Sequence, residues 1–178
     1  ATHQALTIAE YVNSPLYIVH LMSKESAQEI QRAKERGSVV YSETLAASLG
    51  ADGRPTWHKD WEIAGPHVMS PPLNPDPTVK DYLMRNLHTG NIDTVGSDNC
   101  TFCLSQKKMG HDDFSKIPNG VNGIEDRLAV MWTKGVKTGS ISPGEFVRAT
   151  STNAAQIFNM YPNKGVISEG ADADVVVW

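Results

Sequence analysis

The chain has few cysteines, which limits the metal and redox sites it can build. Only Cys100 and Cys103 occur among the 178 residues, in a C-x-x-C spacing. That spacing is found in redox and zinc sites, but a structural zinc site needs a second pair of ligands at close spacing, and the sequence has none. Two free thiols in a reducing cytosol are the better interpretation, and we expect a cytoplasmic protein.

Other familiar signals are also missing. The net charge is −4, and no run of basic residues indicates a nucleic-acid partner. No apolar stretch approaches the roughly 20 residues of a membrane span, so no membrane partner is expected. The absence of a P-loop and of G-x-G-x-x-G argues against the commonest nucleotide sites, and without G-x-S-x-G a nucleophile elbow is excluded.

What is present is an alternation of helical and strand patterns in the first half. Helices are predicted at 3–12 and 24–36, the second beginning at Ser23 and ending at Gly37, and strands at 16–21 and from Val39 to about Thr44. The strand at 16–21 is almost continuously apolar, as expected for a parallel strand buried on both faces. The alternation predicts βαβ units and an α/β fold.

Two long segments, 45–77 and 99–120, interrupt this alternation and are expected to be irregular, with 70–73 extended because each proline restricts the residue before it. Further helices are predicted from Asp76 or Thr78 through Leu87, over 124–138, from the capping box 142–145, and around 154–158. The Val175-Val176-Val177 run suggests entry into a separate β element.

Two side chains stand out as candidates for chemistry. Asp98 follows the β-prone run 92–96, and His20 lies near the end of the strand predicted at 16–21. Active sites of parallel α/β folds lie at the carboxyl ends of strands, and a histidine with a carboxylate there suits zinc-assisted hydrolysis. The alternatives are an aspartate that caps the next turn and a hydrogen-bonded core histidine.

A catalytic zinc normally has about three protein ligands, and neither H-E-x-x-H nor H-x-H occurs. If this is a metal site, the missing ligands lie upstream of Ala1. Both ends of the chain also look abrupt, so a fragment of a longer protein is expected.

Eight stretches together resemble one family. They are 15–24, 40–43, 68–73, 96–102, 113–120, 125–127, 150–155 and 170–175. In this order, they resemble the carboxyl-terminal part of dihydropyrimidinases, D-hydantoinases and the dihydropyrimidinase-related (collapsin-response-mediator) proteins. The resemblance covers essentially the whole chain, and the combination is specific although each stretch alone is weak.

The resemblance implies a fold. Members are built on a metal-dependent hydrolase (β/α)8 TIM barrel with a smaller β-rich domain. Since a complete barrel needs about 250 residues, residues 1–165 are expected to form part of the barrel and 166–178 the return into the small β domain.

The resemblance also implies site residues. In hydrolytic members, four histidines, one aspartate and a bridging carboxylated lysine hold two zinc ions. His20 falls on the last of those histidines and Asp98 on the aspartate, which is also the general base; the other ligands would lie upstream. Ser70 and Asn119 fall on positions whose main-chain groups hold the cyclic amide substrate.

The implied activity is opening of dihydrouracil or dihydrothymine to an N-carbamoyl-β-amino acid in pyrimidine catabolism, by a homotetramer. The fragment alone is expected to be inactive. Two alternatives stay open: a non-enzymatic related scaffold protein, and a hydantoinase or allantoinase.

Overall fold

The centre of the molecule is a three-stranded parallel sheet. The computed structural model describes residues 1–177, and its strands are β1 (Leu16–Ile18), β2 (Val40–Leu45) and β3 (Thr94–Gly96), in the order β1-β2-β3. Ile18 is level with Ser42, and Gly96 is level with Leu45. The α/β prediction is confirmed, and all the carboxyl ends of the strands meet at one edge of the sheet.

Helices flank this sheet. The α-helices are α1 (Thr2–Tyr11), α2 (Lys24–Glu35), α3 (Ala46–Gly50), α4 (Trp61–Ala64), α5 (Val79–Thr89), α6 (Leu104–Lys107), α7 (Arg127–Met131), α8 (Pro143–Val147) and α9 (Asn153–Ile157). Short 3-10 turns lie at Arg54–Trp57, Gly65–His67, Lys108–Gly110 and Phe114–Lys116, and π-helical turns at Trp132–Val136 and Arg148–Thr152. The first π-helical turn extends α7, and the second joins α8 to α9.

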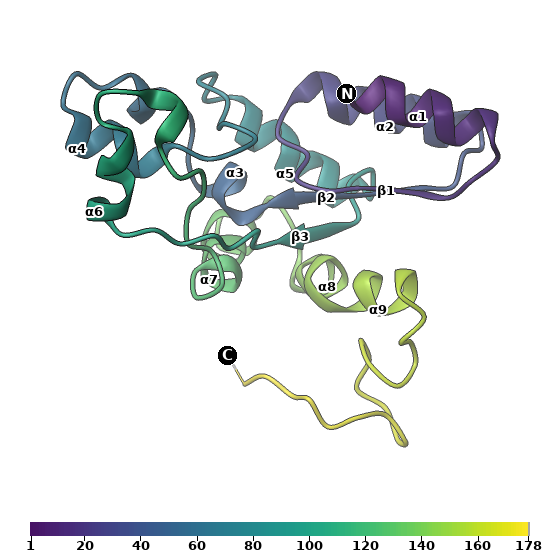
Figure 1. Cartoon of the computed structure of the whole chain (residues 1–178). Helices are drawn as coiled ribbons and strands as arrows, with labels where there is room; N and C mark the ends of the chain where they lie inside the picture. Colours follow the sequence, from purple (N-terminus) through teal and green to yellow (C-terminus); the bar gives the residue numbers. More distant parts are fainter. Residues whose placement is uncertain (178) are drawn as a thin grey trace.

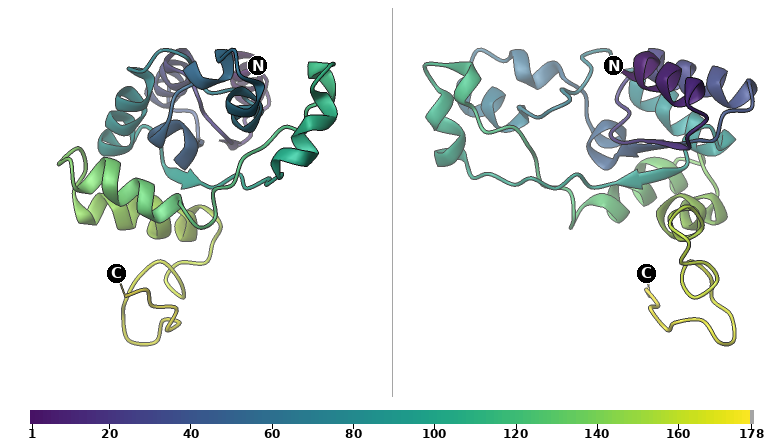
Figure 2. Two further views of the ribbon diagram at one scale, coloured as in Figure 1. Left: turned by 90° about the vertical axis from the view of Figure 1, so that its left-hand side faces the viewer. Right: turned by 45° about the vertical axis from the view of Figure 1, so that its right-hand side comes forward.

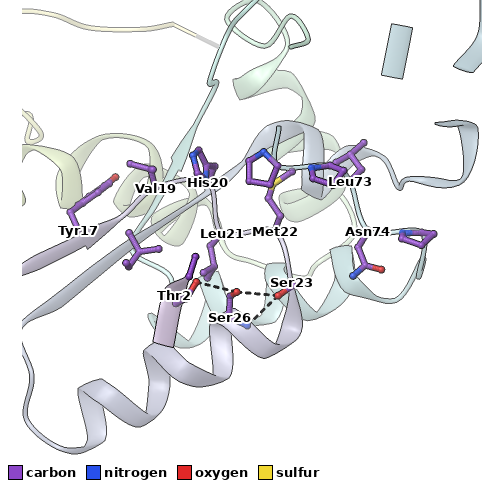
Figure 3. A pocket seen from close by; sticks show the side chains of 15 residues that line it. Thr2, Tyr17, Val19, His20, Leu21, Met22, Ser23, Ser26, Leu73 and Asn74 are labelled. Carbon is purple, nitrogen blue, oxygen red and sulfur yellow. Dashed lines mark hydrogen bonds between the residues drawn. The ribbon is translucent and has the colours of Figure 1, made fainter. Parts of the chain in front are cut away.

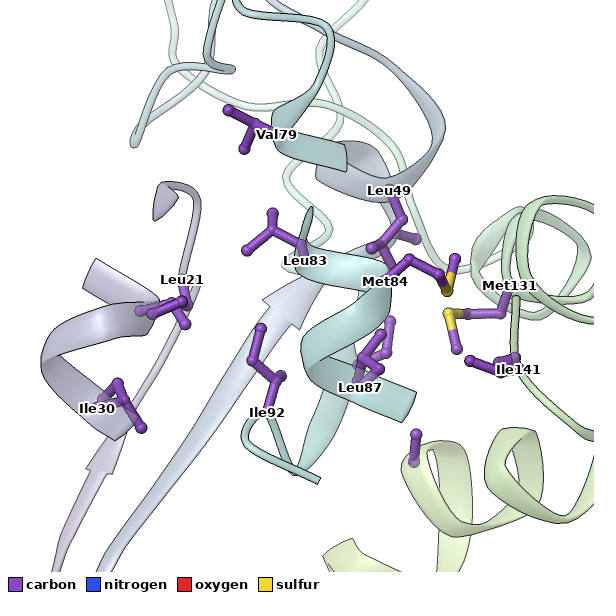
Figure 4. Close-up of a cluster of buried hydrophobic side chains, with 14 of the residues drawn as sticks. Leu21, Ile30, Leu49, Val79, Leu83, Met84, Leu87, Ile92, Met131 and Ile141 are labelled. Atoms are coloured by element: carbon purple, nitrogen blue, oxygen red, sulfur yellow. The ribbon is translucent and has the colours of Figure 1, made fainter. Parts of the chain in front are cut away.

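One face of the sheet carries the main hydrophobic core. Helices α1, α2 and α5 lie over this face (Figure 1). Leu83 and Leu87 of α5 pack with Ile30 of α2 in one buried cluster (Figure 4). Val40 of β2 and Val95 of β3 belong to the same cluster. Because alternate residues of β2 point to this core, the intervening side chains of the strand face the other side of the sheet.

Several helix boundaries follow local sequence rules. The Ser23 hydroxyl accepts the backbone N–H of Ser26 at the start of α2, and Gly37, with φ of 91°, lies just beyond its end. The capping box of α8 is formed by Ser142 and Glu145, as predicted.

Three predictions need correction. β1 ends at Ile18 and not at residue 21, since His20 has a left-handed φ of 37° that interrupts the extended backbone. The segments 45–77 and 99–120, predicted to be irregular, contain short helices, among them α4 and α6, which lie beside each other beyond the sheet (Figure 1; Figure 2, right). No strand forms at Val175–Val177 in the described part of the chain, because no partner strand lies beside it. The domain boundary at 165 stays a prediction.

Within residues 1–177 no helix is long and apolar enough to span a membrane.

Candidate active site

His20 and Asp98 follow the two outer strands in the same way. His20 lies two residues beyond the end of β1, and Asp98 lies two residues beyond the end of β3. Their φ angles are 37° and 44°, in the left-handed region that non-glycine residues seldom adopt. Such backbone conformations cost about 1–3 kcal/mol and cluster at functional sites, so both residues are strong candidates.

Neither candidate side chain has a polar partner in the described part of the chain. The His20 imidazole and the Asp98 carboxylate form no hydrogen bond or ion pair within residues 1–177. The purely structural alternatives, a capping aspartate and a hydrogen-bonded core histidine, therefore lack support in this structure. Imidazole nitrogen and carboxylate oxygen are donors that zinc accepts, so the residues fit the implied metal.

The described residues do not form a complete metal site by themselves. No cluster of three or more histidine, cysteine, aspartate or glutamate side chains that could hold a metal ion occurs among residues 1–177. A catalytic zinc needs about three protein ligands, so His20 and Asp98 alone are too few to hold one.

A pocket brings His20 close to the proline-rich segment. It has a volume of about 600 Å³ and is lined by His20, Tyr17 and Met22 on one side and by 71–75 on the other (Figure 3). Ser70 directly precedes this segment, through a cis Ser70–Pro71 peptide bond. The structure therefore places His20 near residues 71–75, which directly follow Ser70.

Ser70 and Asn119 offer unused main-chain groups. Both residues are exposed, and the N–H and C=O groups of both lack a hydrogen-bond partner within residues 1–177. The Asn119 side chain donates to the Ile117 carbonyl at 3.1 Å, which fixes the turn. Free backbone groups in a fixed turn can hold an amide, whose N–H and C=O groups need one acceptor and one donor.

The segments around these residues are bonded to each other. The backbone N–H of Gly120 donates to the Val68 carbonyl at 3.1 Å, and the N–H of Cys100 donates to the Val121 carbonyl at 3.0 Å. Gly120 has φ of 145°, and a Cβ there would lie 2.3 Å from the Cys100 carbonyl oxygen. Only glycine allows this approach, and the Ser70, Asp98 and Asn119 segments are thereby joined.

Lys107, the last residue of α6, is the central buried group of this region. Its side chain is 2% exposed, and Nζ donates to the carbonyls of Val68 at 2.6 Å and of Gly120 at 2.7 Å. Nζ also lies 5.9 Å from the centre of the Phe102 ring. Burial lowers the pKa of Lys107.

A second polar group crosses the three strands of the sheet. The Tyr17 hydroxyl is 3.2 Å from Glu43 Oε2 and 2.6 Å from Thr94 Oγ1. Burial raises the pKa of Tyr17 to about 12, so the phenol stays protonated at neutral pH. These three residues come from three different strands, and their contacts link β1, β2 and β3.

The two cysteines are exposed free thiols. The Ser105 hydroxyl lies 3.0 Å from Cys103 Sγ and is the main cause that lowers the pKa of this thiol.

Sequence reasoning did not single out Lys107 or Glu43. Lys107 stands in a Gln-Lys-Lys run inside a segment predicted to be irregular, where a lysine is normally solvated. Its burial depends on contacts with residues 39 and 13 positions away. Nothing in the local sequence marks those contacts.

A parallel sheet flanked by helices, with polar residues at its carboxyl edge, is typical of α/β enzyme folds. The chain belongs to the amidohydrolase family, whose model matches residues 18–178.

Among curated relatives, the whole chain is 57% identical to dihydropyrimidinase of Rattus norvegicus and 44% identical to dihydropyrimidinase-related protein 5 of Homo sapiens. The chain spans 34% and 32% of their lengths, about a third in each case.

Solved structures show the same likeness. The dihydropyrimidinase from Brevibacillus agri matches 97% of this chain with a TM-score of 0.93 at 40% identity, and the chain covers 37% of it. A D-hydantoinase from a Bacillus species matches 98% with a TM-score of 0.94, also at 40% identity, and the chain covers 38% of it. The family resemblance and the amidohydrolase fold are thus confirmed for this segment.

Proposed function

We propose that this chain is the carboxyl-terminal part of a dihydropyrimidinase, a zinc-dependent hydrolase that opens the ring of dihydrouracil and dihydrothymine to N-carbamoyl-β-amino acids. The observation that carries the proposal is the pair His20 and Asp98, both left-handed and both unpaired at one edge of the parallel sheet. The 57% identity to the rat dihydropyrimidinase supports the choice of substrate class.

His20 and Asp98 are the ligands that this chain supplies in the proposal, with the other ligands, including a carboxylated lysine, upstream. When bound, zinc lowers the pKa of a water molecule and polarises a carbonyl group. Asp98 accepts the proton of the attacking water and donates it to the departing ring nitrogen. This role needs an accessible carboxylate, and Asp98 is exposed.

Ser70 and Asn119 orient the ring in the proposal. Their free main-chain N–H and C=O groups complement the cyclic amide, which presents both a donor and an acceptor. The pocket beside His20 provides a partly apolar wall through Leu73 and Met22. In the complete protein we further propose a cytoplasmic homotetramer acting in pyrimidine catabolism.

A second candidate is a non-enzymatic related protein. The 44% identity to human dihydropyrimidinase-related protein 5 over the whole chain favours it. Retention of both His20 and Asp98 favours the enzyme, because a scaffold has no need for unpaired metal-ligating side chains in left-handed conformations. A hydantoinase stays an alternative, because a D-hydantoinase from a Bacillus species has the same fold over this chain.

The test is ring opening of dihydrouracil, hydantoin and allantoin by the full-length protein, with zinc content measured on the same sample. We expect dihydrouracil to be the preferred substrate, zinc to be bound, and chelation to abolish turnover. The isolated 178-residue chain serves as the inactive control. A folded full-length protein with no zinc and no turnover of any substrate would support the scaffold alternative, and a preference for hydantoin or allantoin would change the substrate.

A further inference from the structure

The buried ammonium of Lys107 is unusual in having no carboxylate partner among residues 1–177. Its hydrogen bonds go to the carbonyls of Val68 and Gly120, and its remaining contact is the ring of Phe102. Burying a charged group is costly unless its donors are satisfied. Two carbonyls and one aromatic ring account for the three ammonium protons.

The two carbonyls belong to segments that are far apart in the sequence. Val68 precedes Ser70 by two residues, and Gly120 follows Asn119 directly. One nitrogen within 2.7 Å of both carbonyl oxygens holds the two backbone segments at a fixed separation, next to the Gly120–Val68 backbone hydrogen bond.

The local structure keeps Lys107 in this position. The Gln106 side chain accepts the backbone N–H of Cys103 at 2.9 Å and so caps the start of the short helix α6. The next residue, Lys108, points outward instead and pairs with Glu62 of α4 at the surface. Two adjacent lysines therefore have opposite environments, one buried and one exposed.

We propose that Lys107 is a positioning residue for substrate binding: its ammonium sets the spacing between the main-chain groups of Ser70 and Asn119 that receive the cyclic amide. The proposal rests on the proposed function and adds to it a residue that touches neither substrate nor metal. Since it acts on binding groups and not on His20 or Asp98, it predicts an effect on KM without loss of zinc.

The experiment compares K107M, K107R and K108M in the full-length protein. Methionine matches the aliphatic stem of lysine but lacks the ammonium, so it leaves the Gly120 carbonyl unpaired and the Val68 carbonyl with only the Gly120 N–H. K107M should therefore raise KM for dihydrouracil about tenfold with little change in kcat and unchanged zinc content. K107R keeps the charge but cannot place one nitrogen between both carbonyls, and should raise KM about threefold. K108M should have the KM of the unaltered protein.

Amide hydrogen exchange supplies a readout that does not depend on turnover. In K107M or K107R the Gly120 amide, which donates to Val68, should exchange faster than in K108M. If K107M does not fold, K107R decides the outcome by the same two measurements.

An unchanged KM in the folded Lys107 variants, or loss of zinc together with activity, would overturn the positioning role. If the unaltered protein does not open dihydrouracil, the proposed function fails by itself. The exchange comparison then still decides whether Lys107 holds the two segments together, and equal Gly120 exchange in all variants would refute it.

Discussion

The side-chain oxygen of Asn99 accepts the backbone N–H of Gly123 at 3.0 Å. This bond connects the residue after Asp98 to the turn before α7. A Cβ on Gly123 would lie 2.5 Å from the Ser97 carbonyl oxygen, so the two segments are in close contact on both sides of Asp98. The orientation of Asp98 therefore depends on a contact 24 residues away in the sequence.

Asn99→Ala should lower kcat for dihydrouracil about tenfold, because loss of the Gly123 hydrogen bond, worth about 1 kcal/mol, releases the backbone that presents Asp98. The control is Asn122→Ala, which removes a surface hydrogen bond to Asp126. Steady-state kinetics of both variants in the full-length protein provide the comparison. Equal kcat values for the two variants would contradict this role of Asn99.

Gly96→Ala should disturb the Tyr17–Glu43–Thr94 group. A Cβ at Gly96 would lie 2.5 Å from the Glu43 carboxyl carbon, so the Glu43 side chain would have to move away from Tyr17. The Glu43 carboxylate is the far end of a flexible side chain, so the cost is mainly the lost hydrogen bond to Tyr17, about 1 kcal/mol. We expect a lower free energy of unfolding in urea.

The matched control for that change is Gly144→Ala in the first turn of α8. A Cβ there meets only the Ser142 hydroxyl at 3.9 Å, so this variant should be neutral or more stable by up to about 1 kcal/mol. If both alanine variants unfold at the same urea concentration, the steric account of Gly96 is wrong.

These contacts show which parts of the protein were predictable. The ends of α2 and α8 follow from Ser23, Gly37 and the Ser142–Glu145 capping box, because capping involves residues within one turn of each other. The parallel sheet follows from the alternation of helix and strand patterns, and the structure confirms it.

The candidate site was only partly predictable. The sequence indicated His20 and Asp98 as residues at strand ends, but their left-handed backbone results from chain paths that only the fold determines. The burial of Lys107 and the Asn99–Gly123 contact are set by residues distant in the sequence. The roles of His20, Ser70, Asp98 and Asn119 stay predictions.

Leu83→Ala should destabilise the protein without a specific effect on the site. Leu83 is fully buried at the centre of the core between α5 and the sheet (Figure 4). The cavity left by alanine costs about 2–5 kcal/mol, whereas Leu83→Met nearly conserves volume and should cost less than about 1.5 kcal/mol. Urea unfolding measures both. Similar losses in the two variants would mean that the core around Leu83 adapts easily.

Glu145 should make stability depend on acid pH. Its pKa is lowered from the ordinary 4.5 to about 2, first by the Ser142 backbone N–H and then by His88. Because the folded pKa is the lower one, the stabilisation is fully present above pH 4.5 and is lost as the pH falls toward 2. Glu145→Gln keeps the capping hydrogen bond but removes the charge, so its stability should change less between pH 5 and pH 3.

The measurement for Glu145 is urea unfolding at several pH values, with Glu169→Gln as the control. Glu169 is exposed and forms no hydrogen bond or ion pair within residues 1–177. The control should keep the pH dependence of the unaltered protein. A Glu145→Gln variant with that same dependence would show that this carboxylate does not contribute.

Asp98→Ala in the full-length protein should remove both a metal ligand and the general base. General acid–base catalysis alone contributes about 10²–10⁴-fold, so kcat should fall at least about 100-fold, and zinc content should fall as well. The control is Asp112→Ala, since the Asp112 side chain is 98% exposed and, within residues 1–177, pairs only with His111. His20→Ala should reduce zinc content but leave the base in place. Turnover close to normal in Asp98→Ala would exclude Asp98 as the base, because no exposed carboxylate elsewhere could replace a group held in this position at the end of β3.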